Sequence, residues 1–177
     1  PVSIFRLQWV NVAKSGGNRG ATALSSWGEF MFQGVVGINL DAKGRLAIPT
    51  KHREAITSGP EKKLVLTSHP HRCLLIYPSE AWAPIRAQIM TFPSFDPKLS
   101  LWKRLLVGFA EEMELDNSGR VLISTSQRHF AGLEKRIMLV GQGSHFELWS
   151  ESSWEQQISQ FDEGPTSPPP GMEDFAL

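Results

Sequence analysis

Basic side chains gather in one short segment of the sequence, residues 41–53. Lys43, Arg45, Lys51 and Arg53 stand within eleven residues of one another. Such a cluster attracts phosphates, and an arginine guanidinium can pair bidentately with a guanine edge in the major groove of DNA. The residue types therefore predict DNA binding led by Arg45 and supported by the other three. Asp41 has the predicted role of orienting the arginine or the turn.

The same segment has a second interpretation that the residues leave open. Asp41 and Arg45 are four residues apart, and they could form a salt bridge that only stabilises a turn. A comparison with the rest of the chain bears on this choice, because the segment occurs twice.

Residues 40–48 (LDAKGRLAI) return 75 positions later as residues 115–123 (LDNSGRVLI). Over 41–53 and 116–128, 6 of 13 positions are identical, where average composition gives roughly one. The offset shrinks to 73 and then 72 further along the chain, as small loop deletions within one shared plan would produce. The chain is therefore predicted to be a tandem duplication.

The second copy has the equivalent residues in a different charge context. Asp116, Arg120 and Arg128 match Asp41, Arg45 and Arg53, while serines stand where copy one has Lys43 and Lys51. The second-copy residues are therefore predicted to be weaker DNA contacts or structural. The charge of the chain is also uneven, because residues 1–110 carry a net charge of +8 and residues 111–177 a net charge of −8. This separation is expected if the first part of the chain binds a polyanion.

Each copy is predicted to contain the same elements. A strand, an Asp-x-x-Gly turn and a second strand form a tight hairpin, and a short helix, two more strands and a longer helix follow. In copy one these elements are expected at 35–40, 45–48, 51–55, 63–67, 73–77 and from Ser79, a predicted N-cap. In copy two they are expected at 110–123, 126–131, 136–140, 145–149 and from Ser150.

Two helices are predicted between the copies. Asp96-Pro97 is typical of an N-cap followed by proline at the first helical position, so helices 79–90 and 96–108 should form a linking hairpin. The fold class is α+β and β-rich. Its predicted parts are a module at 35–82, linking helices at 83–110, a module at 111–154, the end of a helix at 155–161, an N-terminal extension at 1–30 outside the fold, and a disordered acidic tail at 162–177.

The doubled Asp-x-x-Gly-Arg motif, the linking helices and Phe-Glu-Leu-Trp at 146–149 resemble the MraZ family over about residues 31–161. The resemblance implies tandem AbrB-like swapped-hairpin modules (SpoVT-AbrB type), closed homo-oligomeric rings, and a cytoplasmic, nucleoid-associated protein. It also implies a transcriptional regulator, usually a repressor, that binds short direct repeats upstream of the division and cell-wall gene cluster. In the family the arginine of the first module, here Arg45, faces double-stranded DNA.

The sequence gives little support to other classes of function. No phosphate-binding loop or nucleophile elbow is present, so no enzyme, cofactor or small-molecule substrate is predicted. His69, His71 and Cys73 are close in sequence, but they are expected to form a plain surface loop rather than a metal site. No membrane span is predicted. The alternative function is a ring-forming protein-interaction scaffold in which DNA binding is secondary.

Overall fold

The computed structural model describes residues 31–57, 60 and 62–160. The predicted extension at 1–30 and the predicted tail at 162–177 lie outside the described residues. Along the chain the elements are β1 (Val35–Asn39), β2 (Arg45–Ala47), α1 (Thr50–Ile56), β3 (Lys63–Ser68), β4 (Leu74–Pro78), α2 (Ser79–Met90), α3 (Pro97–Lys103), a π-helical turn η1 (Arg104–Gly108), β5 (Glu111–Glu114), β6 (Arg120–Leu122), α4 (Thr125–Phe130), β7 (Arg136–Gly141), β8 (Phe146–Ser150) and α5 (Glu151–Ser159).

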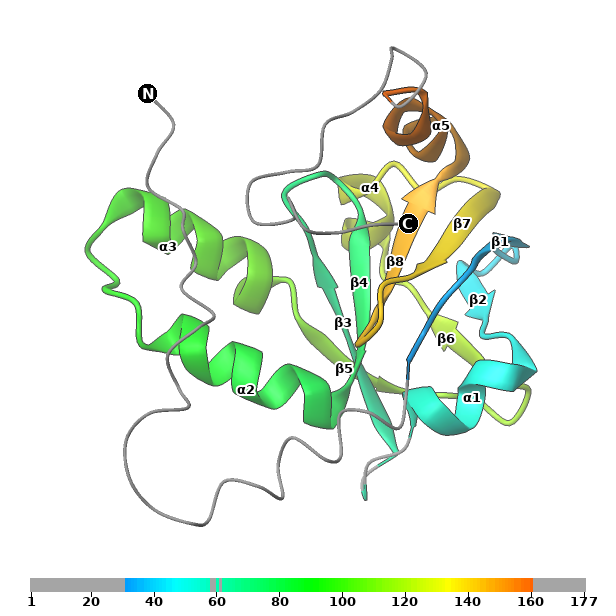
Figure 1. Ribbon diagram of the computed structural model, residues 1–177, viewed down its shortest axis with the longest axis horizontal. Helices are drawn as coiled ribbons and strands as arrows, with labels where there is room; N and C mark the ends of the chain where they lie inside the picture. Colours follow the sequence, from blue (N-terminus) through cyan, green and yellow to red (C-terminus); the bar gives the residue numbers. More distant parts are fainter. Residues whose placement is uncertain (1–30, 58–59, 61, 161–177) are drawn as a thin grey trace, which may run out of the picture. The chain divides into compact units, whose positions relative to one another are not determined.

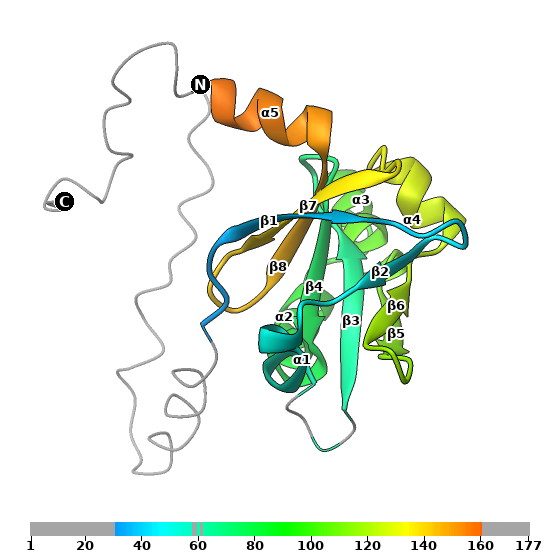
Figure 2. The ribbon, with the colours of Figure 1, turned by 90° about the vertical axis from the view of Figure 1, so that its right-hand side faces the viewer.

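The two copies exchange strands. A six-stranded antiparallel sheet has the order β1-β7-β8-β4-β3-β5, and β2 pairs with β6 in a separate two-stranded ribbon. Each strand beside an Asp-x-x-Gly turn therefore pairs with a strand of the other copy (Figures 1 and 2). The exchange covers strand edges that a single copy would leave open.

This arrangement corrects the predicted tight hairpins. The first turn does close, since the Gly44 amide donates to the Asp41 carbonyl at 2.9 Å and the Asp41 amide to the Arg45 carbonyl at 3.0 Å. Beyond the turn the two strands separate: β1 joins β7 and β2 joins β6. The partner of β2 is thus a strand of the second copy in the same chain.

Apolar side chains form a core on each face of the sheet. The larger core lies between the sheet and the β2–β6 ribbon, and it includes Leu46, Val121 and Phe146. The smaller core, with Trp82 and Trp149, lies under the linking helices, which Figure 1 shows beside β3 and β4. Burial of these faces supplies the main driving force for the fold.

The linking helices are attached to the sheet by two buried hydroxyl groups. Thr67 and Ser68 on β3 have no exposed surface, and their hydroxyls donate to the carbonyls of Leu106 and Leu105 in η1. A π-helical turn interrupts the regular pattern of helical backbone hydrogen bonds. Here the two carbonyl groups accept hydrogen bonds from side-chain hydroxyls of β3. The helical hairpin is thus held against the sheet at a defined position.

The helix starts agree with the sequence at two of three positions. The Asp96 carboxylate caps α3 by accepting from the Leu99 amide at 2.9 Å, and the Ser150 hydroxyl caps α5 by accepting from the Ser153 amide at 3.2 Å. The prediction of Ser79 as an N-cap is wrong: it is the first helical residue, and Pro78 precedes it with no side-chain cap. In the described residues, no helix is long and apolar enough to span a membrane.

Three partly buried histidines make folding depend on pH. Burial lowers the pKa of His52, His69 and His145 below the ordinary histidine value of about 6.5, so the unfolded chain binds protons more readily. Their contribution to stability is complete above that value and is lost as the pH falls through the lower folded-state pKa.

We predict that thermal stability falls between about pH 7 and pH 5 and that His145→Gln reduces this dependence. His145 stacks on Tyr77 with ring centroids 4.5 Å apart, whereas exposed His129 provides the matched His129→Gln control. Melting curves recorded across this pH range would check it. An identical pH profile in wild type and His145→Gln would contradict the assignment.

Candidate nucleic-acid interface

The β2–β6 ribbon brings the two motif arginines onto one face. In its antiparallel register Arg45 lies opposite Leu122, and Ala47 lies opposite Arg120. The middle pair, Leu46 and Val121, is buried in the core. Because side chains alternate between the faces of a strand, the four flanking residues share the outward face.

Each arginine is held by the aspartate of its own turn. One oxygen of Asp41 accepts from the Lys43 and Arg45 amides at 2.9 Å, and the other accepts from Arg45 Nε at 2.6 Å. In the second turn, Asp116 makes the same contacts with the Ser118 and Arg120 amides at 2.9 Å and with Arg120 Nε at 2.8 Å. The predicted orienting role of the aspartate thus has a geometric basis.

These contacts explain the acidity of the two aspartates. The hydrogen bond from the Arg45 backbone amide is the largest cause of the lowered pKa of Asp41; desolvation opposes it, and the hydrogen bonds from the Arg45 side chain and the Lys43 amide add to the lowering. The side-chain hydrogen bond from Arg120 is the largest cause of the lowered pKa of Asp116. Both carboxylates therefore stay ionised at neutral pH and hold their arginines in a fixed orientation.

The two aspartate–arginine pairs form one network. Arg120 Nη1 lies 3.9 Å from the Asp41 oxygen that also binds Arg45. All four side chains are partly exposed, between 29% and 35%. A bound anion or base edge would thus meet two oriented guanidinium groups side by side.

The structure does not bring the predicted basic cluster together around the first turn. The Ile48 amide donates to the Gly119 carbonyl at 3.0 Å, so the chain after β2 reaches the second turn. The following helix α1 carries Lys51 and Arg53, and Arg53 packs on Gly119. The reason is strand exchange: β2 pairs with β6 of the second copy, so the residues that follow β2 lie beside the second turn rather than the first.

The reciprocal contact occurs at the first turn. The Ile123 amide donates to the Gly44 carbonyl at 3.0 Å, and the guanidinium of Arg128 packs on Gly44. Lys43 is exposed at the tip of this turn, and the equivalent residue in the second turn is Ser118. The first turn therefore combines Lys43 and Arg45 with Arg128 from the other copy.

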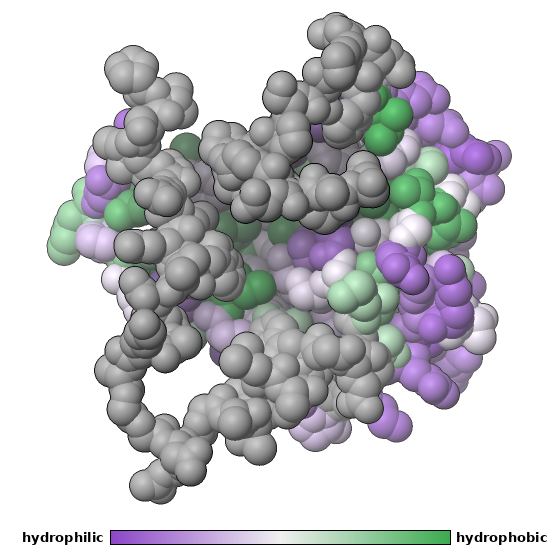
Figure 3. Space-filling view, viewed as in Figure 1, coloured by the Kyte–Doolittle hydropathy of each residue, from purple (hydrophilic) through white to green (hydrophobic). Residues whose placement is uncertain are grey.

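The surroundings of the ribbon are polar. Figure 3 shows hydrophilic residues over the side of the molecule that carries β1, β2, β6 and α1, the side on which the two turns lie. Leu122 is an exception on the ribbon itself, with 58% of its surface exposed. The composition of the basic segment does not point to Leu122, but the repeat does, because a large apolar residue stands here where copy one has the small Ala47.

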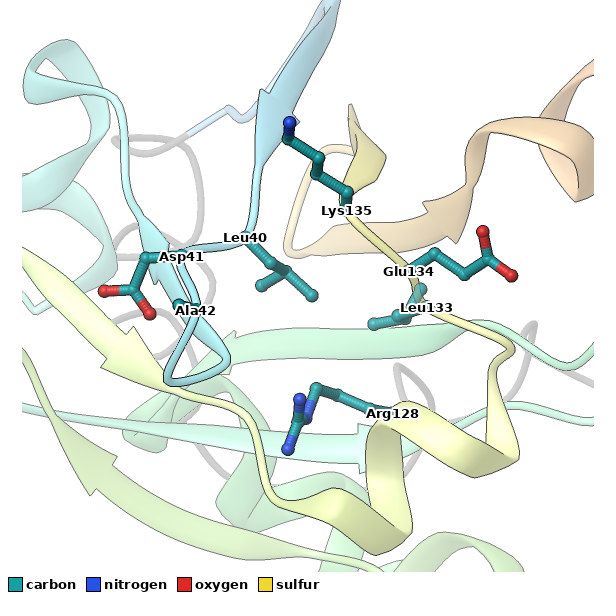
Figure 4. Close-up of a pocket in the computed structure, with 7 residues that line it drawn as sticks. All are labelled: Leu40, Asp41, Ala42, Arg128, Leu133, Glu134 and Lys135. Carbon is teal, nitrogen blue, oxygen red and sulfur yellow. The ribbon is translucent and has the colours of Figure 1, made fainter.

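A cavity of about 370 Å³ lies between the first turn and the segment that joins α4 to β7. Leu40 and Leu133 form its apolar part, and Arg128 lies at its edge (Figure 4). The carboxylates of Asp41 and Glu134 point away from the cavity. The first turn therefore has open space on one side.

The histidine and cysteine segment does not form a metal-ligand set. Cys73 is buried, and burial raises the pKa of its thiol. The rings of His69 and His71 contact each other edge to face, 4.7 Å apart. Among the residues that the structure describes, no group of three or more His, Cys, Asp or Glu side chains could hold a metal ion.

The fold and the site define a class: β-rich proteins of two repeated modules that exchange strands and present paired arginines on one ribbon. The family model "MraZ protein, putative antitoxin-like" matches residues 31–105 and again residues 106–170. The chain belongs to the MraZ family. Both the resemblance drawn from the doubled motif and the duplication are thereby confirmed.

Several relatives match this chain over most of their length. A protein from Methylobacillus flagellatus is 59% identical over 130 residues, which cover 73% of this chain and 88% of the relative. Proteins from Aromatoleum aromaticum and Dechloromonas aromatica are 54% and 52% identical over 148 residues, or 83% of this chain and 100% of each relative. All three bear the name Transcriptional regulator MraZ.

We predict that Gly44→Ala and Gly119→Ala destabilise the fold more than Gly132→Ala does. All three glycines have positive φ, at +78°, +73° and +59°, so each alanine bears a strain of about 1–2 kcal/mol. An added Cβ would be 2.8 Å from the Arg128 guanidinium carbon at Gly44 and would overlap Arg53 at Gly119, but it meets nothing within 4 Å at Gly132. Urea unfolding of the three variants would measure the difference, and equal losses would contradict the turn packing.

Proposed function

We propose that this protein is a sequence-specific, DNA-binding transcriptional regulator that reads DNA with the β2–β6 ribbon and its two turns. The observation that carries this proposal is the network in which Asp41 and Asp116 orient Arg45 and Arg120 on one ribbon face. A two-stranded ribbon fits the major groove, and an oriented guanidinium can read a guanine edge. The names of the relatives support regulation of transcription.

Arg45 is the principal reading residue in this proposal. Its turn carries exposed Lys43, which can hold the phosphate backbone while the arginine contacts a base. Arg120 has the same orientation but lacks a lysine in its own turn, so it contributes less. Lys51 remains a candidate phosphate contact from α1, beside the second turn.

We further infer the target and the direction of regulation from family membership. The proposed sites are short direct repeats upstream of the division and cell-wall gene cluster, and the proposed effect is repression. A footprint of the protein on its own upstream region would test the target. Protection that ignores the repeats, or no protection at all, would contradict it.

The protein is also proposed to act as a homo-oligomer, in the form of a closed ring. Support comes from apolar side chains at the helical hairpin, where Phe95 is fully exposed and Met90, Leu101 and Trp102 are at least 41% exposed. Figure 3 shows hydrophobic residues at this end of the molecule. Exposed apolar patches of this kind are typical of protein interaction sites, and several modules on one operator would bind by effective concentration.

We predict that Arg45→Ala lowers the affinity for operator DNA by roughly ten- to hundredfold per engaged module, and that Arg120→Ala lowers it less. The loss follows from removal of a bidentate base contact. Arg86→Ala, which removes an exposed charge from α2, is the matched control and should bind as the wild type. Fluorescence anisotropy with operator and scrambled duplexes would measure the three affinities.

The same titration, repeated across salt concentrations, separates the proposal from the scaffold alternative. Phosphate contacts make log affinity fall steeply with log salt concentration. A wild-type protein that shows no DNA binding at low salt would overturn the proposed function. Such a protein would leave the exposed apolar residues of the helical hairpin, and hence the scaffold, as the better-supported reading.

Assembly gives a separate prediction. Phe95→Glu and Trp102→Glu should each reduce the oligomer mass measured by light scattering, because each places a charge on the apolar surface at the hairpin tip. Lys98→Glu on the same hairpin controls for the added negative charge. A wild-type monomer at micromolar concentration, or variants with wild-type mass, would count against this interface.

A further inference from the structure

The support of the first turn comes from the other copy of the repeat. Arg128 belongs to α4, and a Cβ built on Gly44 would lie 2.8 Å from its guanidinium carbon and 2.9 Å from its Nε and Nη1 atoms. Three atoms at nearly equal distance mean that the plane of the guanidinium faces the turn backbone. Only a residue without a side chain leaves room for this contact.

Helix α4 is fixed in place, so Arg128 has a rigid base. Ser124 and Gln127 form a capping box at its start. The Gln127 side chain is fully buried, and its amide donates to the carbonyls of Leu66 at 3.4 Å and Phe109 at 3.2 Å. The helix is thereby tied to β3 and to the end of η1.

Arg128 differs from its repeat equivalent in one informative way. Arg53 donates from Nε to the Ile48 carbonyl at 2.8 Å, whereas the Nε of Arg128 is buried and donates to no described residue. Within the described part of the chain, the Arg128 side chain makes one hydrogen bond, from Nη2 to the Thr125 hydroxyl at 3.1 Å. A buried donor without a partner is unfavourable, so packing against Gly44, rather than hydrogen bonding, accounts for the position of this guanidinium.

We propose that Arg128 is a positioning residue that sets the conformation of the first turn and so the presentation of Lys43 and Arg45 to DNA. The proposal rests on the proposed function for its DNA readout. On the side of Leu40 the first turn borders the cavity, which Arg128 also lines (Figure 4). The contact between the Arg128 guanidinium and Gly44 therefore supports the turn on this open side. Arg53 does the same for the second turn, and each DNA-facing turn is therefore set by the other module.

The alternative is that Arg128 binds a DNA phosphate directly, and two variants separate the roles. Arg128→Lys keeps the charge but has no flat guanidinium to pack on Gly44, while Arg128→Met removes the charge. A positioning role predicts that both variants lose at least about tenfold in affinity, because neither restores the packing on Gly44, whereas a phosphate contact predicts that Arg128→Lys binds DNA as the wild type does. Lys43→Met is the control for a phosphate contact and should reduce the slope of log affinity against log salt concentration by about 0.9.

Hydrogen exchange of the turn amides tests the proposal without DNA. The amides of Lys43 and Arg45 are bonded to Asp41, and those of Ser118 and Arg120 are bonded to Asp116 in the same way. In Arg128→Lys, exchange should accelerate at the first pair only, so the second turn serves as an internal control. Arg53→Lys should give the mirror image.

Different results would overturn the positioning role of Arg128 and the proposed DNA-binding function. Affinity restored by Arg128→Lys with a reduced slope in Arg128→Met would show a phosphate contact and overturn the positioning role. Unchanged exchange at Lys43 and Arg45, or equal acceleration at both turns, would overturn it as well. A wild-type protein that does not bind DNA would overturn the proposed function, while selective exchange at the first turn would still uphold the packing role of Arg128.

Discussion

The exchange of strands between the two copies is the constraint on which the rest of this structure depends. Neither copy pairs its own turn-flanking strands beyond the turn; β1 requires β7, β5 requires β3, and β2 requires β6. The central residues of the ribbon, Leu46 and Val121, are buried only because the ribbon lies over a sheet built by both copies. The copies are therefore parts of one folding unit, and neither is expected to be stable alone.

The exchange also determines the electrostatics of the site. It places Arg45 and Arg120 on adjacent strands, where Arg120 lies within 3.9 Å of the Asp41 carboxylate. Two positive groups this close would repel each other without the intervening aspartates, and the aspartates are held in place by backbone amides of the turns. The carboxylates thus allow two guanidinium groups to lie side by side on one face of the ribbon.

The two turns are similar in backbone and different in support and charge. Both close through an aspartate and a glycine, and both receive an arginine from the other copy. The first turn has exposed Lys43 and a neighbouring cavity, and it is supported by Arg128, whose Nε has no hydrogen-bond partner among the described residues. The second has Ser118 and an arginine that is also hydrogen-bonded to Ile48. The two turns therefore share one backbone geometry but differ in charge and in the contacts of the supporting arginine.

The sequence by itself determined the duplication, the order of the elements, the motif residues and the family. These features depend on local spacing: an Asp-x-x-Gly turn closes on its own hydrogen bonds, and Asp96-Pro97 starts a helix wherever it lies. The partners of the strands were decided only by the tertiary structure, because a strand with one apolar face has the same pattern whichever strand it joins. For that reason the sequence grouped Lys51 and Arg53 with the first turn, while the fold delivers α1 to the second turn and Arg128 to the first.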